Sequence, residues 1–346
     1  MKYKRFLGAA TVALLIVIAA TTVATAQIYT DLYNFDGISG GNPAYPALLA
    51  QGRDGNLYGT TFGGGDGGGV VFKITPSGEL KVLYKFEPRY GLGPRGGLTL
   101  GRDGNLYGTT TSGGGVNLAG TIFKITPGGL LTTLYNFTGG TDGSHPNTPP
   151  IQGADGNFYG TAFGVAYKIT PSGSFTQLAS LPVQESTDSP LLQASDGSFY
   201  GTTYRGGSSG DGTVFKITPK GILTIVYNFD GTHGSNPDSL LIQGSDGNFY
   251  GTTSQGGSNV GVVFKLTPRG ALTVRHNFPD PNYPHDGFWP SAGLVRASDG
   301  NFYGVTVYGG TVSYGVIFKI TPSAAYTILY NFDANGGVDP NFETTS

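Results

Sequence analysis

The chain has 346 residues, of which only 12% are charged, and its formal net charge is -2. This balance gives no basic field to attract nucleic acid or an anionic membrane surface, so we expect no nucleic-acid partner. The sequence has no cysteine, which excludes structural disulfides, thiolate metal sites and a cysteine nucleophile.

The first stretch of the chain has the plan of a secretory signal peptide. Lys2, Lys4 and Arg5 precede an apolar run over 6–20, and small residues lead to Ala26 in the A-x-A pattern. We therefore predict a signal peptide over 1–26, cleaved so that the mature protein is secreted, periplasmic or at the cell surface. An uncleaved membrane anchor is the alternative, since 6–26 could just span a bilayer. After cleavage we expect no membrane association.

A short vocabulary then returns along almost the whole chain. The word Asp54-Gly55-Asn56-Leu57-Tyr58 has near copies that begin at Asp103, Asp155, Asp196, Asp246 and Asp299. A lysine-bearing word follows each copy, as Phe72-Lys73-Ile74-Thr75-Pro76 does the first, and an aromatic word such as Leu83-Tyr84-Lys85-Phe86 closes each unit. A period of about 40 to 50 residues built from strand-like words is typical of propeller blades. Glycine and proline stand at fixed offsets between these words, as tight turns require.

Each unit predicts four antiparallel strands. In the first unit these are strand A over 46–51, strand B over 56–62, strand C over 70–75 and strand D over 80–86. Asp-Gly suits the tight A-to-B turn, and Thr-Pro-Ser-Gly suits the C-to-D turn. The B and C words are apolar on both faces, which favours blades covered by neighbours on both sides. We predict an all-β propeller over 27–335 with a short tail over 336–346.

Ring closure is left open by the strand count. The chain contains six A–B–C sets but seven D-like words, because 28–35 reads as an extra one. We predict six blades, with this first D word pairing on the last blade or packing at the seam. Seven blades, or a truncated longer array, are the alternatives.

The words at 212–221, 226–231 and 247–253 resemble the GloVer tandem repeats of exported bacterial proteins, named for Gloeobacter and Verrucomicrobia and described as having a choice of C-terminal anchors. This resemblance implies export and repeat architecture and supplies no catalytic residues. A weaker, fold-level similarity is to virginiamycin B lyase-type propellers, whose blades read Asp-Gly-Asn-Leu and Ile-Thr-Pro-x-Gly. That class works through a histidine, an acid and magnesium. No matching set is found in this sequence, so the similarity implies fold only.

The candidate site is the rim formed by the D-to-A and B-to-C links, which carry nearly all the length variation. Loops on a rigid ring are where binding usually resides. Arg89 and Tyr90 lie on this predicted rim. The candidate ligand-binding residues there are His145, Tyr204, Arg205, Asp211, His233, Tyr283, His285, Asp286, Trp289 and Tyr308.

The most distinctive link is the insertion over 279–290, which brings the single tryptophan, Trp289, next to Tyr283, His285 and Asp286. Exposed aromatic side chains with polar neighbours suit stacking on sugar rings or anchoring a protein partner. The alternative is that Trp289 fills a widened gap between blades. We therefore predict a binding or cell-surface scaffold module for an extracellular glycan or protein, and we expect a monomer.

The four histidines show no spacing typical of a metal pair. His145 and His233 stand in nearly equivalent Asp-Gly-x-His motifs, so a shared metal is an alternative, and His276 is expected to pack. We predict no cofactor, no metal and no catalytic residue. The alternative function is a metal-assisted lyase or hydrolase that uses His145, His233 or His285 with Asp142 or Asp286.

Two features that occur once per blade are expected to be architectural. The Asp-Gly turns each offer one carboxylate, whereas a calcium loop needs several, so turn formation is the better interpretation. The lysine of each C word is expected to pack its stem between blades with its ammonium group in solvent. These lysines are Lys73, Lys124, Lys168, Lys216, Lys265 and Lys319.

Overall fold

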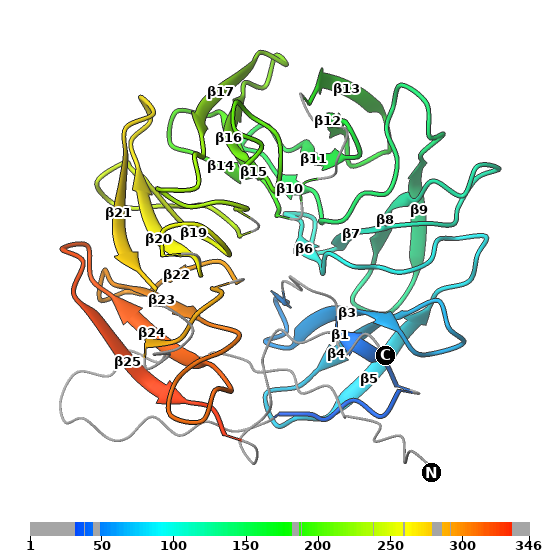
Figure 1. The fold of residues 1–346 in the computed structure, drawn as a ribbon. Helices are drawn as coiled ribbons and strands as arrows, with labels where there is room; N and C mark the ends of the chain where they lie inside the picture. The colour runs from blue at the N-terminus through cyan, green and yellow to red at the C-terminus, as the bar shows by residue number, and fades with distance from the viewer. Residues whose placement is uncertain are drawn as a thin grey trace, which may run out of the picture.

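The computed structural model describes residues 32–37, 39–43, 49–181, 187, 189–237, 239–258, 260–278, 286–290 and 292–333. These residues form six antiparallel sheets arranged as blades around a ring (Figure 1). The predicted six-bladed all-β propeller is therefore confirmed. The predicted signal peptide and C-terminal tail lie outside the described residues. No helix among the described residues is long and apolar enough to cross a membrane.

Each blade has the predicted A–B–C–D strand order. Blade 1 contains β2 (Ala50–Gln51), β3 (Leu57–Gly63), β4 (Val70–Ile74) and β5 (Leu80–Lys85), and an unpredicted strand β1 (Gly41–Pro43) also pairs with β3. The strands of blades 2 to 4 are β6 (Thr99–Leu100), β7 (Leu106–Thr110), β8 (Thr121–Ile125), β9 (Leu131–Asn136), β10 (Ile151–Gln152), β11 (Phe158–Ala162), β12 (Val165–Ile169), β13 (Phe175–Ser180), β14 (Leu192–Gln193), β15 (Phe199–Thr203), β16 (Thr213–Ile217) and β17 (Leu223–Asn228). The strands of blades 5 and 6 are β18 (Ile242–Gln243), β19 (Phe249–Thr253), β20 (Val262–Leu266), β21 (Leu272–Asn277), β22 (Val295–Arg296), β23 (Phe302–Val305), β24 (Val316–Ile320) and β25 (Tyr326–Asn331).

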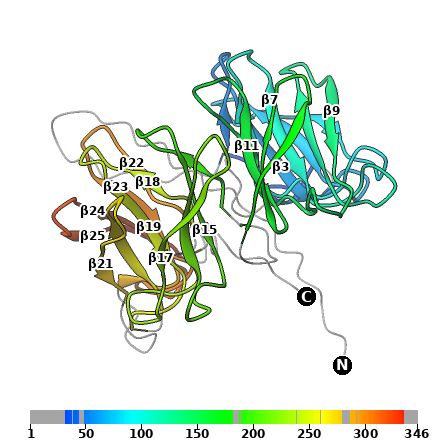
Figure 2. The ribbon, with the colours of Figure 1, turned by 90° about the horizontal axis from the view of Figure 1, so that it is seen from above.

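The A strands are shorter than predicted, with two residues each, and lie toward the middle of the ring, whereas the D strands β9, β13, β17, β21 and β25 lie on its outside (Figure 1). Figure 2 shows blades 1 to 3 gathered on one side of the molecule and blades 4 to 6 on the other. Burial follows this order. The B and C strands are almost wholly buried, and the D strands alternate between half-buried and exposed residues.

A central glycine in each B strand makes room for an aromatic ring of the C strand beside it. At Gly251 a Cβ atom would lie 2.7 Å from Cζ of Phe264. Real Cβ atoms do not approach so closely, so the glycine of the Tyr-Gly-Thr word is a packing requirement. The two strands pair directly at this point, with Gly251 opposite Phe264.

The main contact between consecutive blades, here called a joint, is an aromatic one. The tyrosine of strand B stacks on the ring that opens strand B of the next blade, with centroid separations of 3.8 Å for Tyr107 and Phe158 and 3.9 Å for Tyr159 and Phe199. Such a stacked pair contributes about 0.5–1.5 kcal/mol beyond the burial of its area. The ring pair recurs at four of the five internal joints because its residues belong to the repeated word, and Leu106 takes the place of the ring beside Tyr58.

The D word adds a second aromatic contact to four of the five internal joints, and Leu181 replaces its phenylalanine in blade 3. Its phenylalanine meets the aromatic residue of the next C strand edge-on, as Phe86 meets Phe123 at 5.2 Å and Phe229 meets Phe264 at 5.4 Å. The buried clusters accordingly each combine residues of two consecutive blades. Hydrophobic burial is thus concentrated between blades, as in other repeat proteins.

Three joints also carry a glutamine clasp, defined as an A-strand glutamine that bonds two blades. Gln152 accepts a hydrogen bond from the backbone N–H of Arg102 in the preceding blade and donates to the carbonyl of Gly156 in its own turn, both at 2.8 Å. Gln193 and Gln243 repeat this arrangement. Leu100 and Arg296 occupy the corresponding positions of blades 2 and 6.

The Asp-Gly words form turns, as predicted. In blade 5 the carboxylate of Asp246 accepts hydrogen bonds from the backbone and side chain of Asn248 and from the hydroxyl of Tyr250. Burial alone would raise the pKa of Asp246, but bonds from Lys265, Asn248 and Tyr250 outweigh it and hold the pKa below its ordinary value. Each turn thereby fixes the hydroxyl end of the tyrosine that makes the joint.

The strand-C lysines lie half-buried, which agrees with packed stems. Some of the ammonium groups also form ion pairs that were not predicted. Nζ of Lys216 lies 2.8 Å from Asp196, and Nζ of Lys265 lies 2.8 Å from Asp246, so both lysines pair with the turn carboxylate of their own blade. They complete the turn network rather than only extending into solvent.

The first D word packs at the seam, against blade 1. Phe35 lies edge-on to Phe72 at 5.2 Å, as Phe86 does to Phe123 at the next joint. Leu32 and Tyr33 pack in the same cluster.

We predict that replacing Asp246 by asparagine lowers the free energy of unfolding by about 1–2 kcal/mol, since a charged acceptor of several partly exposed hydrogen bonds is lost. The pKa of Asp246 is lower in the folded state, so its stabilisation is full above the unfolded pKa and is lost as the pH falls through the folded value. The variant should therefore lose less stability than the natural chain between about pH 5 and pH 2. Urea denaturation at several pH values measures this.

Asp66 provides the matched control. Its carboxylate is 72% exposed and its contact with Lys85 is 3.5 Å long. Asp66→Asn should change stability little at any pH. Equal losses in the two variants would contradict a structural role for the turn carboxylate.

Candidate functional site

The D-to-A and B-to-C links meet on one rim, as predicted. Isolated bridges join the D-to-A link to the end of the next B strand, pairing Leu92 with Ser112, Ser235 with Gln255 and Phe288 with Tyr308. In these three joints the link is therefore hydrogen-bonded to the following blade. Side chains on these links are presented from a backbone that is fixed by hydrogen bonds.

One position recurs in four links, directly before a proline. These pre-proline positions are Gly93, His145, Asn236 and Trp289. Their φ angles are 62°, 47°, 56° and 56°, all in the left-handed region. Each backbone N–H donates to a carbonyl of the preceding blade, at 2.9 Å for Gly93 to Gly68 and 3.0 Å for Trp289 to Val260.

The pre-proline positions therefore combine one backbone with four different side chains. A left-handed conformation costs a residue other than glycine about 1–3 kcal/mol and persists only where the surroundings enforce it. Since glycine suffices at the first joint, histidine, asparagine and tryptophan are not needed to form the link. The side chain at this position can therefore differ from joint to joint without changing the backbone of the link.

Trp289 belongs to an aromatic cluster with Phe288 and Tyr308. Phe288 stacks on Tyr308 at 5.4 Å, and Trp289 lies edge-on to Tyr308 at 5.6 Å. Phe288 and Tyr308 also exchange backbone hydrogen bonds, and Val307 donates to the carbonyl of Trp289. Trp289 remains 43% exposed. A side chain that fills a gap between blades would be buried, so the exposed indole fits a contact surface better.

Tyr204, Arg205 and Asp211 lie together in the preceding joint. The guanidinium carbon of Arg205 is 5.9 Å from the ring centroid of Tyr204. Ser235 donates to the carboxylate of Asp211 at 2.8 Å, and the side chain of Asn236 donates to the carbonyl of Tyr204 at 3.1 Å. The structure thus brings these three predicted residues into one polar, hydrogen-bonded link next to the Trp289 joint.

His145 and His233 do not occupy equivalent places. His145 stands before a proline with a left-handed backbone, and its counterpart in the later link is Asn236. The cause is the place of the Asp-Gly-x-His motif within each link, because His145 directly precedes Pro146 whereas His233 lies four positions before Pro237. The two histidines therefore lie two joints apart in different settings.

The side chains of the two histidines have separate local partners. His145 is exposed, with Nδ1 2.8 Å from the hydroxyl of Ser144. Nδ1 of His233 lies 2.8 Å from Asp230, and the His233 backbone N–H also donates to that carboxylate. The backbone hydrogen bond is the main cause that lowers the pKa of Asp230. Among the described residues no group of three or more His, Asp or Glu side chains is placed to hold a metal ion.

Asp286 faces the sixth blade, and its backbone carbonyl accepts a hydrogen bond from the hydroxyl of Tyr326. Its carboxylate lies 4.0 Å from Nε2 of His276. His276 stacks on Tyr326 at 3.9 Å, so the expected packing role is confirmed. Burial lowers the pKa of His276, and Asp286 partly opposes that shift. Tyr283 and His285 lie outside the described residues.

Asp142, considered above as an acid, is used by its own link. It is 8% exposed and accepts hydrogen bonds from Thr138 and from the hydroxyl of Tyr135. Burial would raise the pKa of Asp142, but the Thr138 and Tyr135 bonds lower it further than burial raises it. Asp142 is therefore a structural carboxylate held as an anion.

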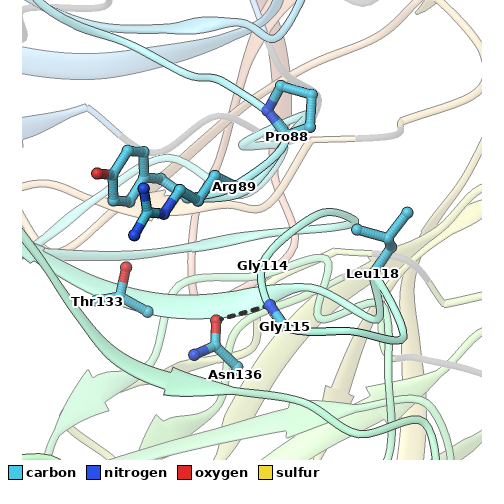
Figure 3. A pocket seen from close by; sticks show the side chains of 8 residues that line it. Pro88, Arg89, Gly114, Gly115, Leu118, Thr133 and Asn136 are labelled. Atoms are coloured by element: carbon cyan, nitrogen blue, oxygen red, sulfur yellow. Dashed lines mark hydrogen bonds between the residues drawn. The ribbon is translucent and has the colours of Figure 1, made fainter.

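A groove of about 500 Å³ opens on the rim between blades 1 and 2 (Figure 3). The guanidinium carbon of Arg89 lies 5.6 Å from the ring centroid of Tyr90, and Asn136 accepts a hydrogen bond from Gly115 at 3.2 Å. Sequence reasoning placed Arg89 and Tyr90 on the rim but missed the groove. Thr133 and Asn136 come from the outer strand β9. The sequence signal for open space beside that strand is the glycine run 113–115 in the preceding link. The full lining is Pro88, Arg89, Tyr90, Gly114, Gly115, Leu118, Thr133 and Asn136.

The sequence matches a family model described as the Gloeobacter/Verrucomicrobia repeat, over residues 17–165 and again over 162–346. Both matches together span the whole ring of blades. A comparison with curated proteins found no match.

Solved structures with the same architecture include virginiamycin B lyase from Staphylococcus aureus and a streptogramin B lyase. Each is 18% identical and covers 86% of both chains, with TM-scores of 0.62 and 0.60. A putative 6-phosphogluconolactonase from Bacteroides uniformis is 17% identical over 81% of this chain and 82% of its own, with a TM-score of 0.51. At these identities the likeness shows a shared fold.

We predict that His276→Tyr makes the protein more resistant to acid. Tyr135 stacks on Phe175 at 4.1 Å in the earlier joint, so tyrosine fits this place. The pKa of His276 is lower when folded, so the stability from its neutral ring is full above the unfolded pKa and is lost as the pH falls through the folded value. Between about pH 7 and pH 5 the variant should lose less stability than the natural chain, measured by urea denaturation.

If the natural chain and His276→Tyr lose the same stability over that range, the buried imidazole does not control the acid response.

Proposed function

The chain belongs to the Gloeobacter/Verrucomicrobia repeat family, and from this premise we propose that it is an exported, non-enzymatic propeller that binds a glycan through its rim. The observation that carries the proposal is Trp289, an aromatic side chain 43% exposed on a hydrogen-bonded backbone. An indole held in place stacks on the apolar face of a sugar ring with little loss of side-chain entropy.

Polar groups in the joint before that of Trp289 would orient such a ligand. Tyr204 and Arg205 occupy the neighbouring joint, and the exposed guanidinium of Arg205 can donate several hydrogen bonds to hydroxyl or carboxylate oxygens. An aromatic platform beside a few directional donors is the usual composition of a binding surface. The low net charge, -2, favours recognition by stacking and hydrogen bonding over recognition by charge.

The alternative is the metal-assisted lyase or hydrolase, for which the fold shared with virginiamycin B lyase provides the motive. Such chemistry would use His233, whose imidazole meets Asp230 at 2.8 Å, or His145. The glycan proposal is preferred because the rim aromatic cluster is exposed and ordered, whereas His145 and His233 lie in separate joints.

We predict that Trp289→Gly abolishes glycan binding and leaves the fold intact. Gly93 fills the equivalent place in the first joint, and glycine relieves the left-handed backbone, so the melting temperature should change little. Removing a central aromatic contact should weaken binding at least tenfold, at roughly 1.4 kcal/mol per tenfold. A glycan array identifies the ligand, and calorimetry with that ligand measures the change.

His145→Gly is the matched control, because it makes the same backbone change at another pre-proline position and should retain binding. Silence across a broad glycan array would overturn the proposal, and capture of one defined protein instead would assign the rim to a protein partner. Turnover in a screen with divalent metals, abolished by His233→Ala or His145→Ala, would establish the enzyme instead.

Export is the second part of the proposal and rests on residues 1–26 alone. When the full chain is expressed in a bacterial host, the exported form should begin at Gln27, which intact-mass spectrometry detects. Ala26→Leu should block this cleavage, since the site requires a small residue, whereas Ala20→Leu, within the apolar run, should not. A full-length chain retained in the cytoplasm would contradict the prediction.

A further inference from the structure

The seam between blade 6 and blade 1 differs from the five other joints. At a joint, strand B of one blade offers its tyrosine to what we call the leading face of the next blade. That face is formed by the first residue of strand B and by the strand-A residue that pairs with it, as Gln51 pairs with Leu57 in blade 1. At the five internal joints the first B-strand residue is buried to an exposed fraction of 0–2%. These residues are Leu106, Phe158, Phe199, Phe249 and Phe302.

The leading face of blade 1 is not covered in this way. Leu57, the counterpart of those five residues, is half-exposed, and so is Leu49, whose counterparts Leu98 and Leu241 are 2% and 1% exposed. A small apolar cavity of about 10 Å³ opens between Leu49, Leu57 and the first D word. Gln51 is exposed, whereas the three glutamines of the clasps are half-buried.

The face of blade 6 that borders the seam is also less buried than the matching faces of the other blades. In blade 6, Tyr303 and Ile317 are each 7% exposed, whereas Tyr58 and Val71, their counterparts in blade 1, are fully buried. Val295, in strand A, is 55% exposed. Both faces of the seam are therefore less covered than the faces of any internal joint.

One extended segment already lies at the seam. Leu32 to Phe35 takes the place of a preceding D strand against blade 1, with Phe35 edge-on to Phe72 at 5.2 Å. The carbonyl of Leu32 lies against Gly78, as that of Leu83 lies against Gly129 in the next joint. The seam thus contains the outer strand of a blade, and blade 6 has its own D strand, β25.

We propose that the seam binds three further strands of this same repeat, an A–B–C set, with Leu32 to Phe35 as their fourth strand. The five internal joints define what fits there. A B-strand tyrosine would cover Leu57, and an A-strand backbone would meet Gln51. A complete blade from a second copy does not fit, because its own D strand would occupy the place that Leu32 to Phe35 holds.

A synthetic peptide with the sequence of residues 239–268, the A–B–C set of blade 5, tests the proposal with the full-length chain. It should bind with one-to-one stoichiometry in fluorescence anisotropy and raise the melting temperature by mass action. The same peptide carrying Tyr250→Ala should bind at least about tenfold more weakly, because it lacks the ring that makes the joint.

Leu57→Arg in the protein should abolish binding, and Gln51→Arg, at an exposed position that folding tolerates, should weaken it. Ile222→Arg is the control, since Ile222 is 63% exposed on blade 4 and should leave binding unchanged. The proposal would be overturned if the natural chain did not bind the peptide. It would also be overturned if Leu57→Arg and Gln51→Arg bound the peptide as tightly as the natural chain does. Self-association of the chain that Leu57→Arg removes, without peptide binding, would also overturn it and would assign the seam to a second copy.

Discussion

The contact between the strand-B tyrosine and the first residue of the next strand B, a ring at four of the five internal joints, holds consecutive blades together. It is built from the same word that supplies the Asp-Gly turn, so Tyr250 both meets Phe302 and donates its hydroxyl to Asp246. A blade therefore cannot present its tyrosine correctly unless its own turn is formed. Because burial is concentrated between blades, each blade depends on its neighbours for stability, which explains how a cysteine-free chain with 60 glycines keeps a defined fold.

This arrangement separates stability from recognition. The turn rim repeats one network in all six blades, and the link rim keeps one backbone while its side chains change. Gly93, His145, Asn236 and Trp289 share a left-handed conformation enforced by hydrogen bonds to the preceding blade. The ring can thus exchange one pre-proline side chain for another at little cost to its packing, and the Trp289 cluster is the most developed example.

The repeated words were sufficient to predict the blades, their strand order and their turns, since each word satisfies local geometry and joint packing together. The rim was only partly predictable. The equivalence expected for His145 and His233 was wrong because a local motif match ignores the proline that fixes the register of each link. The left-handed positions share a following proline, but the residue type alone did not mark them, because tryptophan has no preference for the left-handed region whereas glycine and asparagine do. The exposure of Leu57 depends on its neighbour across the seam, and an identical word is buried elsewhere.

The glutamine clasps make the middle of the array different from its ends. Each clasp accepts a hydrogen bond from a backbone N–H of the preceding blade and so joins blades 2 through 5, through Gln152, Gln193 and Gln243. Leu100 and Arg296 leave the outer joints without this hydrogen bond. In an array held by nearest-neighbour contacts, fluctuations start where the ties are fewest. The amide protons of Arg102, Ala154 and Ser195 should consequently exchange with solvent only when the central blades separate, so that the molecule frays from its two ends inward while its centre remains closed.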